Sequence, residues 1–221
     1  MKYIRKLSPP PEFFINDTIA LTIWDDYYSD KKRKLKKYIL DNEQFWLCCY
    51  CEKKVTLDGG ASHVEHIDSR ELNPPLTFDY KNLVVSCQGD TYNDIDFNKS
   101  KNTCGHKKPN DFDKNLFLNP TIETDIQDYF TYEDNGIMKP SDKDKGKAKY
   151  TITLLNLNGD NNLLAEARKK VLIQLRNSIK NLNLSNDEKK NKIRLLLSKN
   201  DREYISFLRY RFYFLIQDKV E

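Results

Sequence analysis

All five cysteines and all three histidines of this 221-residue chain lie between residues 48 and 106. Cys48 and Cys51 form a C-x2-C pair, a spacing at which two thiolates can bind one tetrahedral zinc ion. Cys87 and Cys104 could complete a four-thiolate site, and Cys49 is then the spare because Cys49-x-Cys51 is too tight a spacing. The sequence therefore predicts a structural Zn²⁺ in a site built from four cysteines. Buried cysteines without a ligand are the alternative.

Composition excludes several classes of protein. Hydrophobic residues make up 38% of the chain, charged residues 32% and aromatic residues 12%, and the formal net charge is only +4, so the chain is not of the disordered type. It contains no apolar run of 18 residues, and its first residues lack the apolar core of a secretory signal. We therefore expect a cytoplasmic protein without a membrane partner, whose reduced cysteines are available to a metal.

The histidines lie beside a carboxylate in a pattern that suits hydrolysis. His63-Val64-Glu65-His66 is followed by Asn82 and then by Cys104-Gly105-His106-Lys107-Lys108. One carboxylate and one imidazole with open water positions suit a hard divalent ion such as Mg²⁺ or Mn²⁺. A second, neutral imidazole beside that ion can take a proton from water near pH 7. The combination predicts metal-assisted hydrolysis, with phosphodiesters as the natural substrate class.

The order of these motifs resembles the HNH nuclease family in its zinc-stapled form. The matching pieces are C-x2-C, Glu-His, Asn-Leu-Val-Val-Ser-Cys and Cys-Gly-His-Lys-Lys. The family belongs to the ββα-metal, or His-Me finger, superfamily, so the resemblance implies a small ββα-metal unit. Two departures stand out: the proline often found shortly after the base is absent from Ile67-Asp68-Ser69-Arg70, and Gln88–Thr103 splits the second cysteine pair.

The resemblance implies a role for each matching residue. His66 would be the general base that activates the attacking water, and Asn82 would fix the loop that holds this base. Glu65 and His106 would bind the catalytic Mg²⁺ or Mn²⁺, and all four residues would form the catalytic site.

Three further residues stay open in their roles. Neighbouring residues of a strand point to opposite faces, so simple alternation would pair His63 with Glu65. His63 is otherwise a packing or substrate-contact residue. Lys107 and Lys108 could contact phosphate or could be ordinary surface lysines.

The predicted fold class is α+β and mostly helical, in three parts. Residues 1–45 form an N-terminal helical arm with a helix at about 25–42, and its lysine run at 31–37 is interpreted as a solvated face. Residues 46–112 form the HNH core, with strands at 62–67 and 82–87. Residues 113–221 form a basic helical bundle; helices are expected near 161–182, 186–198 and 201–217, and a helix is favoured over a strand at 150–157.

The C-terminal part has two further features. Ser185 with Glu188, and Asn200 with Glu203, are spaced as capping boxes at two helix starts. Residues 165–215 carry thirteen basic and five acidic side chains, a local charge of +8 that could face phosphates or solvent. The aromatic residues after 203 could fill this chain's own core or dock a partner protein.

Similarity extends to the HNH proteins of bacterial anti-phage defence, the PtuB-type component of Septu and of retron-linked operons. It covers MKYIRK at the start, 129–137 and 148–168. In that family the nuclease acts with an ATPase partner (PtuA-like), and the retron can be part of a larger complex. No G-x4-G-K-[ST] loop is present here, so a nucleotide switch would lie on the partner. The resemblance implies an endonuclease acting on nucleic acid, with DNA favoured over RNA such as tRNA.

A protein of a different class would keep the zinc without catalysis. A non-catalytic zinc-stabilised nucleic-acid-binding or adaptor module would need the four cysteines alone. It would have no need for Glu65, His66 and His106 together, and their joint presence favours the enzyme.

Overall fold

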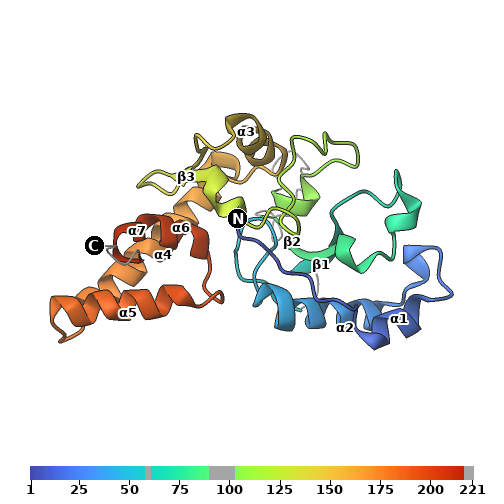
Figure 1. Cartoon of the computed structure of the whole chain (residues 1–221), viewed down its shortest axis with the longest axis horizontal. Coiled ribbons are helices and arrows are strands. Elements are labelled where there is room, and N and C mark those ends of the chain that lie inside the picture. The colour runs from blue at the N-terminus through green and yellow to red at the C-terminus, as the bar shows by residue number, and fades with distance from the viewer. Residues whose placement is uncertain (58–60, 90–102, 217–221) are drawn as a thin grey trace.

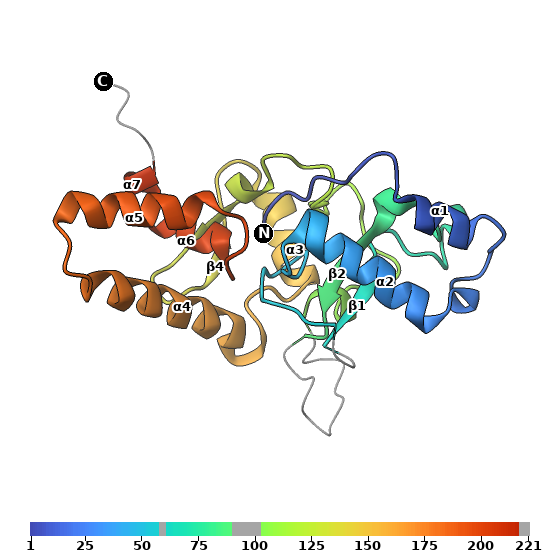
Figure 2. The same ribbon diagram turned by 90° about the horizontal axis from the view of Figure 1, so that it is seen from below.

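The computed structural model describes residues 1–57, 61–89 and 103–216. The chain is 47% helical with two small two-stranded sheets, which confirms the predicted α+β class. Figure 1 shows two groups of elements at opposite ends of the molecule, with α3 (Lys145–Leu154) and β3 (Phe130–Tyr132) between them. The N-terminal helices and the first sheet form one group, and the C-terminal helices form the other; Figure 2 shows the same separation.

The first sheet carries the histidine motif. Strands β1 (Ser62–His66) and β2 (Leu83–Cys87) pair antiparallel, with Glu65 opposite Val84 and His63 opposite Ser86. All five β2 residues are buried, and their β-branched valines suit a packed pleated surface. Both predicted strands are confirmed, and the alternation of β1 places His63 and Glu65 on the same face.

Helix α2 (Ser29–Ile39) packs under this sheet and is joined to it by one side chain. Its buried face includes Leu35 and Ile39, and a π-helical turn (Leu40–Gln44) ends it. The Gln44 amide accepts from Val85 N at 2.7 Å and donates to Val85 O at 2.8 Å, as a neighbouring strand would. The helix expected at 25–42 is confirmed, although it begins only at Ser29 because Tyr27 and Tyr28 adopt extended backbone angles.

Aromatic rings pack the N-terminal arm against the loop between the two strands. Helix α1 (Glu12–Thr18), which the sequence did not predict, places Phe14 with its ring centroid 5.6 Å from that of Tyr80. Trp24 and Phe78 lie 5.7 Å apart. The arm and the core therefore share one hydrophobic cluster, and the division at residues 45 and 112 stays a prediction.

The C-terminal helices follow the predicted pattern with two errors, the first of which is that the helix expected near 201–217 begins only at Ile205 and is interrupted at Phe212. These are α4 (Leu163–Lys180), α5 (Asn186–Ser198), α6 (Ile205–Arg211) and α7 (Tyr213–Ile216), and α3 confirms the helix favoured at 150–157. The Ser185–Glu188 capping box is present. The second box is wrong: Tyr204 precedes α6 with a left-handed backbone (φ 54°), and the Glu203 carboxylate accepts from Lys54 N at 2.7 Å instead.

This half also contains a hairpin that was not expected, and its last two helices differ in how far their apolar side chains are buried. A β3–β4 hairpin, with β4 at Met138–Pro140, was not predicted. Most aromatic and aliphatic residues of α6 are buried core, whereas Tyr213 and Phe214 of α7 are 57% and 73% exposed. No helix among the described residues combines the length and apolarity needed to span a bilayer.

Buried Glu52 joins the cysteine turn to these helices. Its carboxylate accepts hydrogen bonds from the backbone N–H of Ser206 at 2.9 Å and from the Ser206 hydroxyl. Its carbonyl accepts from Tyr204 N at 3.0 Å. Burial would raise the pKa of Glu52, but the positive N-terminus and the bonds from Ser206 lower it, so the group stays charged and paired.

Candidate active site and metal centre

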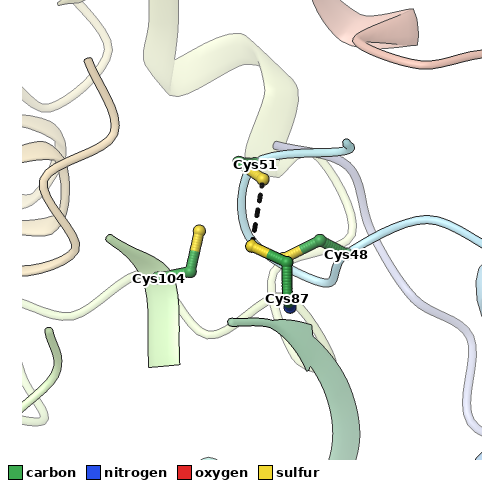
Figure 3. A group of neighbouring side chains, drawn as sticks. All are labelled: Cys48, Cys51, Cys87 and Cys104. Atoms are coloured by element: carbon green, nitrogen blue, oxygen red, sulfur yellow. Dashed lines mark hydrogen bonds between the residues drawn. The ribbon is translucent and has the colours of Figure 1, made fainter. Parts of the chain in front are cut away.

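Four cysteines converge on one point. The sulfur atoms of Cys48, Cys51, Cys87 and Cys104 all lie within 4.8 Å of one another, and all four residues are buried (Figure 3). The Sγ atoms of Cys51 and Cys87 are 3.8 Å apart. Four thiolates at about 2.3 Å from a tetrahedral zinc ion lie roughly 3.8 Å from one another, so the cluster has the dimensions of a zinc site.

Separate segments deliver these sulfurs. Cys48 and Cys51 lie in the turn before β1, Cys87 ends β2, and Cys104 opens a 3-10 turn (Cys104–His106). Cys87 N donates to Cys48 Sγ at 3.3 Å, which favours a thiolate there. Burial would raise the pKa of Cys48, but hydrogen bonds from the neighbouring cysteines, led by Cys104, lower it well below its usual value. Burial raises the pKa of Cys49, which lies outside the cluster as predicted.

Glu65 is the centre of the second cluster. Its Oε2 lies 3.3 Å from His63 Nε2, and its Oε1 accepts from Tyr50 OH at 3.1 Å and lies 3.3 Å from Lys108 Nζ. Burial opposes ionisation of Glu65, but the contacts with His63 and Lys108 outweigh it and lower its pKa. The structure therefore holds a buried, charged carboxylate on the same strand face as His63.

Gly105 allows this cluster to close. A Cβ at this position would lie 2.7 Å from Glu65 Oε2 and 2.8 Å from His63 Nε2. Real Cβ atoms essentially never show such contacts, so a larger residue would displace the carboxylate or the imidazole. The 3-10 turn approaches β1 this closely only with glycine at its centre.

His66 faces the other side of β1. Its ring meets the edge of the Trp24 ring at 4.6 Å between centroids, and its Nε2 lies 3.0 Å from the Thr77 carbonyl oxygen. A carbonyl oxygen only accepts, so Nε2 carries the hydrogen and the Nδ1 of the neutral ring carries the lone pair. Burial lowers the pKa of His66 to about 4, so the ring is neutral at pH 7.

Asn82 clamps the loop that contains Thr77. Its Oδ1 accepts from Asp68 N at 2.7 Å, and its Nδ2 donates to Asp68 O at 3.0 Å and to Leu76 O at 3.1 Å. The loop from residue 67 to 77 is thereby fixed at both ends, next to the carbonyl that orients His66. The resemblance implied that Asn82 fixes the loop that holds the base, and this role stays a prediction.

The three imidazoles do not form one group. His63 and His106 are in ring contact at 4.4 Å between centroids, and His106 also bonds to Gln88, whereas His66 lies against Trp24. Burial and the neighbouring His63 lower the pKa of His106. In the part of the chain that the structure describes, only the four cysteines form a set of three or more ligand atoms within 4.8 Å of one another.

A hollow of about 240 Å³ connects the two sides of β1. Glu65 and His66 both line it, together with Trp24, Arg70 and Lys108. The Lys108 side chain is only 5% exposed and donates to the backbone carbonyls of His66 and Ile67 at 3.2 and 2.8 Å. Lys108 therefore supports the strand end from within, while Lys107 is half-buried on the neighbouring surface.

Sequence reasoning missed several residues of this site. Tyr50, Thr77 and Trp24 contact Glu65 or His66 but lie outside the histidine motif. The position of Tyr50 within the Cys48–Cys51 pair was the one feature of the sequence that could have indicated a place near the site. Thr77 acts through its backbone carbonyl, a role that leaves no signature in the side chain.

Comparison with known proteins follows the same motifs. No family model matches this chain. A Vibrio cholerae protein, named as the candidate HNH endonuclease of retron Vc95, is 34% identical over 149 residues, covering 63% of this chain and 66% of that protein. An Escherichia coli protein, named as the candidate HNH endonuclease of retron Ec83, is 29% identical over 197 residues, covering 73% and 74%. The chain thus spans slightly under two thirds of the first relative and about three quarters of the second.

Proposed function

Because this chain belongs to the family of retron-linked HNH proteins, we propose that it is a metal-dependent endonuclease that hydrolyses phosphodiester bonds of nucleic acid. The observation that carries the proposal is the pairing of a neutral, carbonyl-oriented imidazole at His66 with the buried, charged Glu65 in one hollow. A base and a metal-binding carboxylate on adjacent residues are what hydrolysis by an activated water requires.

His66 would act as the general base through Nδ1. Its Nε2–H bond to Thr77 O fixes both the ring orientation and the tautomer, so the lone pair of Nδ1 is available to a water molecule. Asn82 would act as a positioning residue because it holds the segment that contains Thr77.

Glu65 and His106 would hold the Mg²⁺ or Mn²⁺. Such an ion, when bound, polarises the scissile phosphate and stabilises the leaving oxygen. Glu65 already carries its negative charge, and the lowered pKa keeps His106 neutral and able to ligate. His63 contacts both residues and stays the alternative ligand. Among the described residues, the donor atoms of Glu65, His63 and His106 are not yet close enough to bind one ion together. The His106 side chain would therefore have to break its contact with Gln88 to reach the ion.

The cysteine cluster would hold Zn²⁺ for structure only. A filled four-thiolate site leaves no open coordination position for water or substrate. It fixes Cys104 and hence Gly105 and His106 against β1. Zinc would therefore position the active site without joining the reaction.

At the level of the cell, we place this nuclease as the effector of an anti-phage defence system in the cytoplasm. The names of both relatives link them to retrons, which supports a retron context. The resemblance to Septu-type proteins supports an ATPase partner, and DNA is favoured over RNA such as tRNA as the substrate.

A His66→Ala variant tests the proposal. We expect it to keep its fold and zinc content but to lose roughly 10²–10⁴-fold in cleavage of plasmid or tRNA with Mg²⁺ or Mn²⁺, the usual contribution of a general base. The assay is run with and without the proposed ATPase partner. Asn42→Ala, a change at an exposed residue that does not line the hollow, is the control and should cleave at the wild-type rate.

Undiminished cleavage by His66→Ala would refute the assignment. Nucleic-acid binding by the unmodified protein, with no cleavage under any metal, would instead favour the zinc-stabilised binding module.

A further inference from the structure

A second hollow lies directly beside the active-site hollow. It has a volume of about 620 Å³ and lies between α2 and β1. Trp24 and Val64 line both hollows, so the two are contiguous across these side chains. Any extended molecule bound at Glu65 and His66 would enter this groove if it continued past Val64.

The wall of the groove formed by α2 is cationic. Lys32, Arg33 and Lys36 line it, and residues at these spacings lie within about 100° of one another around a helix. Asp30 is the one acidic residue among those described along the groove. The lysine run predicted to be a solvated face therefore points three of its basic side chains into a hollow that leads to the active site.

The positive charge continues to the junction of the two hollows. Lys32 Nζ lies 5.3 Å and Arg70 Cζ 6.0 Å from the centre of the Trp24 ring, so two cations flank the shared wall. Arg70 has Asp25 as a partner at 3.7 Å, and Asp25 is 81% exposed. Like charges placed this close favour an anion between them.

Two backbone contacts orient the cationic wall without exhausting it. Lys36 Nζ donates to the Ser62 carbonyl at 2.9 Å. Arg33 Nη1 donates to the Leu57 carbonyl at 2.6 Å, which fixes the guanidinium at the rim of the groove. A guanidinium has five N–H donors, so this bond leaves Arg33 able to donate to a phosphate as well.

From this continuity and charge, we propose that the groove between α2 and β1 binds the sugar–phosphate backbone of the nucleic acid on one side of the scissile phosphate. The proposal rests on the proposed nuclease function and adds the path of the substrate. Lys32, Arg33 and Lys36 contact phosphates without reading bases, because phosphate contacts position a nucleic acid and carry no sequence information directly. The basic surface of α4 and α5 is the competing site.

The test compares two full-length variants that lose the same charge. One carries Lys32→Gln, Arg33→Gln and Lys36→Gln; the matched control carries Lys189→Gln, Lys190→Gln and Lys192→Gln on α5. Both are made on a His66→Ala background, so that probes survive. Fluorescence anisotropy with a labelled DNA duplex, a DNA single strand and tRNA measures affinity between 50 and 200 mM salt, without added Mg²⁺ or Mn²⁺. Thermal melting and zinc content show that each variant is folded.

The groove variant is expected to bind roughly 10- to 100-fold more weakly at 150 mM salt. Its salt dependence, as the slope of log K against log salt, should fall by about 2–3, since each duplex phosphate contact contributes about 0.9. The α5 variant should bind within about threefold of the background protein.

Unchanged affinity and slope in the groove variant would overturn the proposal, as would a loss confined to the α5 variant or no binding of any probe. The two proposals fail separately. If binding depends on the groove residues but the wild-type protein never cleaves, the nuclease proposal is refuted and the groove proposal stands. If a groove variant that retains His66 cleaves normally, the groove proposal is refuted and the nuclease proposal stands.

Discussion

Replacing Asn82 tests whether the loop clamp both stabilises the fold and orients the base. Asn82→Ala removes three hydrogen bonds of 2.7, 3.0 and 3.1 Å from a side chain that is only 7% exposed. At about 1 kcal/mol for each bond, the free energy of unfolding should fall by about 3 kcal/mol. For a chain of this size this corresponds to a melting temperature lower by roughly 6–12 °C.

The same change should affect cleavage more than stability alone explains. Without the bond to Leu76 O, the neighbouring Thr77 carbonyl loses its fixed position, and the His66 ring loses its orientation. A misplacement of about 1 Å can cost roughly 10²-fold in rate, so cleavage should fall by about that factor at a temperature where the variant is fully folded.

Two further variants complete the test. Asn82→Asp keeps the acceptor for Asp68 N–H but turns a carboxylate oxygen toward the carbonyls of Asp68 and Leu76, so it should be at least as destabilised near pH 7. Asn42→Ala is the control, because exposed Asn42 makes a single bond to Tyr38 O at 2.8 Å. It should change stability by less than about 0.5 kcal/mol. An Asn82→Ala protein that melts within about 2 °C of the wild type would refute the clamp.

Three other outcomes are expected. In Gly105→Ala, the added Cβ would lie 2.7 Å from Glu65 Oε2 and 2.8 Å from His63 Nε2, so both side chains must move away. Cleavage should therefore drop by roughly 10–100-fold at similar stability. Gly146→Ala is the control: the atom nearest to its added Cβ is 3.4 Å away, so cleavage should be unchanged. Metal analysis should find one zinc ion per chain in the wild-type protein and in Cys49→Ala, and none in Cys104→Ser. Cys104→Ser should also lose most of its stability. The pKa of His66 is lowered to about 4 from 6.5 in the folded state, so the unfolded chain binds more protons in that window and stability should fall as pH drops from 6.5 to 4. The fall attributable to His66 should be about 3 kcal/mol in urea titrations, and a His66→Gln protein that shows an undiminished fall would contradict this origin.

Helices and strands with strong local signals were predictable. The Ser185 box and the apolar repeat of α4 depend on residues three or four apart, which meet whatever the rest of the chain does. The Asn200–Glu203 box has the same spacing but failed, because Glu203 found a partner in Lys54, far away in the sequence. The β3–β4 hairpin has strands of only three residues, too short to give a periodic signal.

Residue types and their spacing along the chain already set the chemistry available to this protein: four cysteines with zinc spacing, a Glu-His pair, and an Asn followed by a valine-rich strand. These features depend on residue type and on short spacings, which covalent geometry fixes. The way these groups are divided in space came from folding, which put Glu65, His63 and His106 on one side of β1 and held His66 against Trp24 and Thr77 on the other. It also turned Lys108 inward and opened a basic groove beside the site. Such choices arise from contacts between residues far apart in the chain, where burial and charge balance outweigh any local preference.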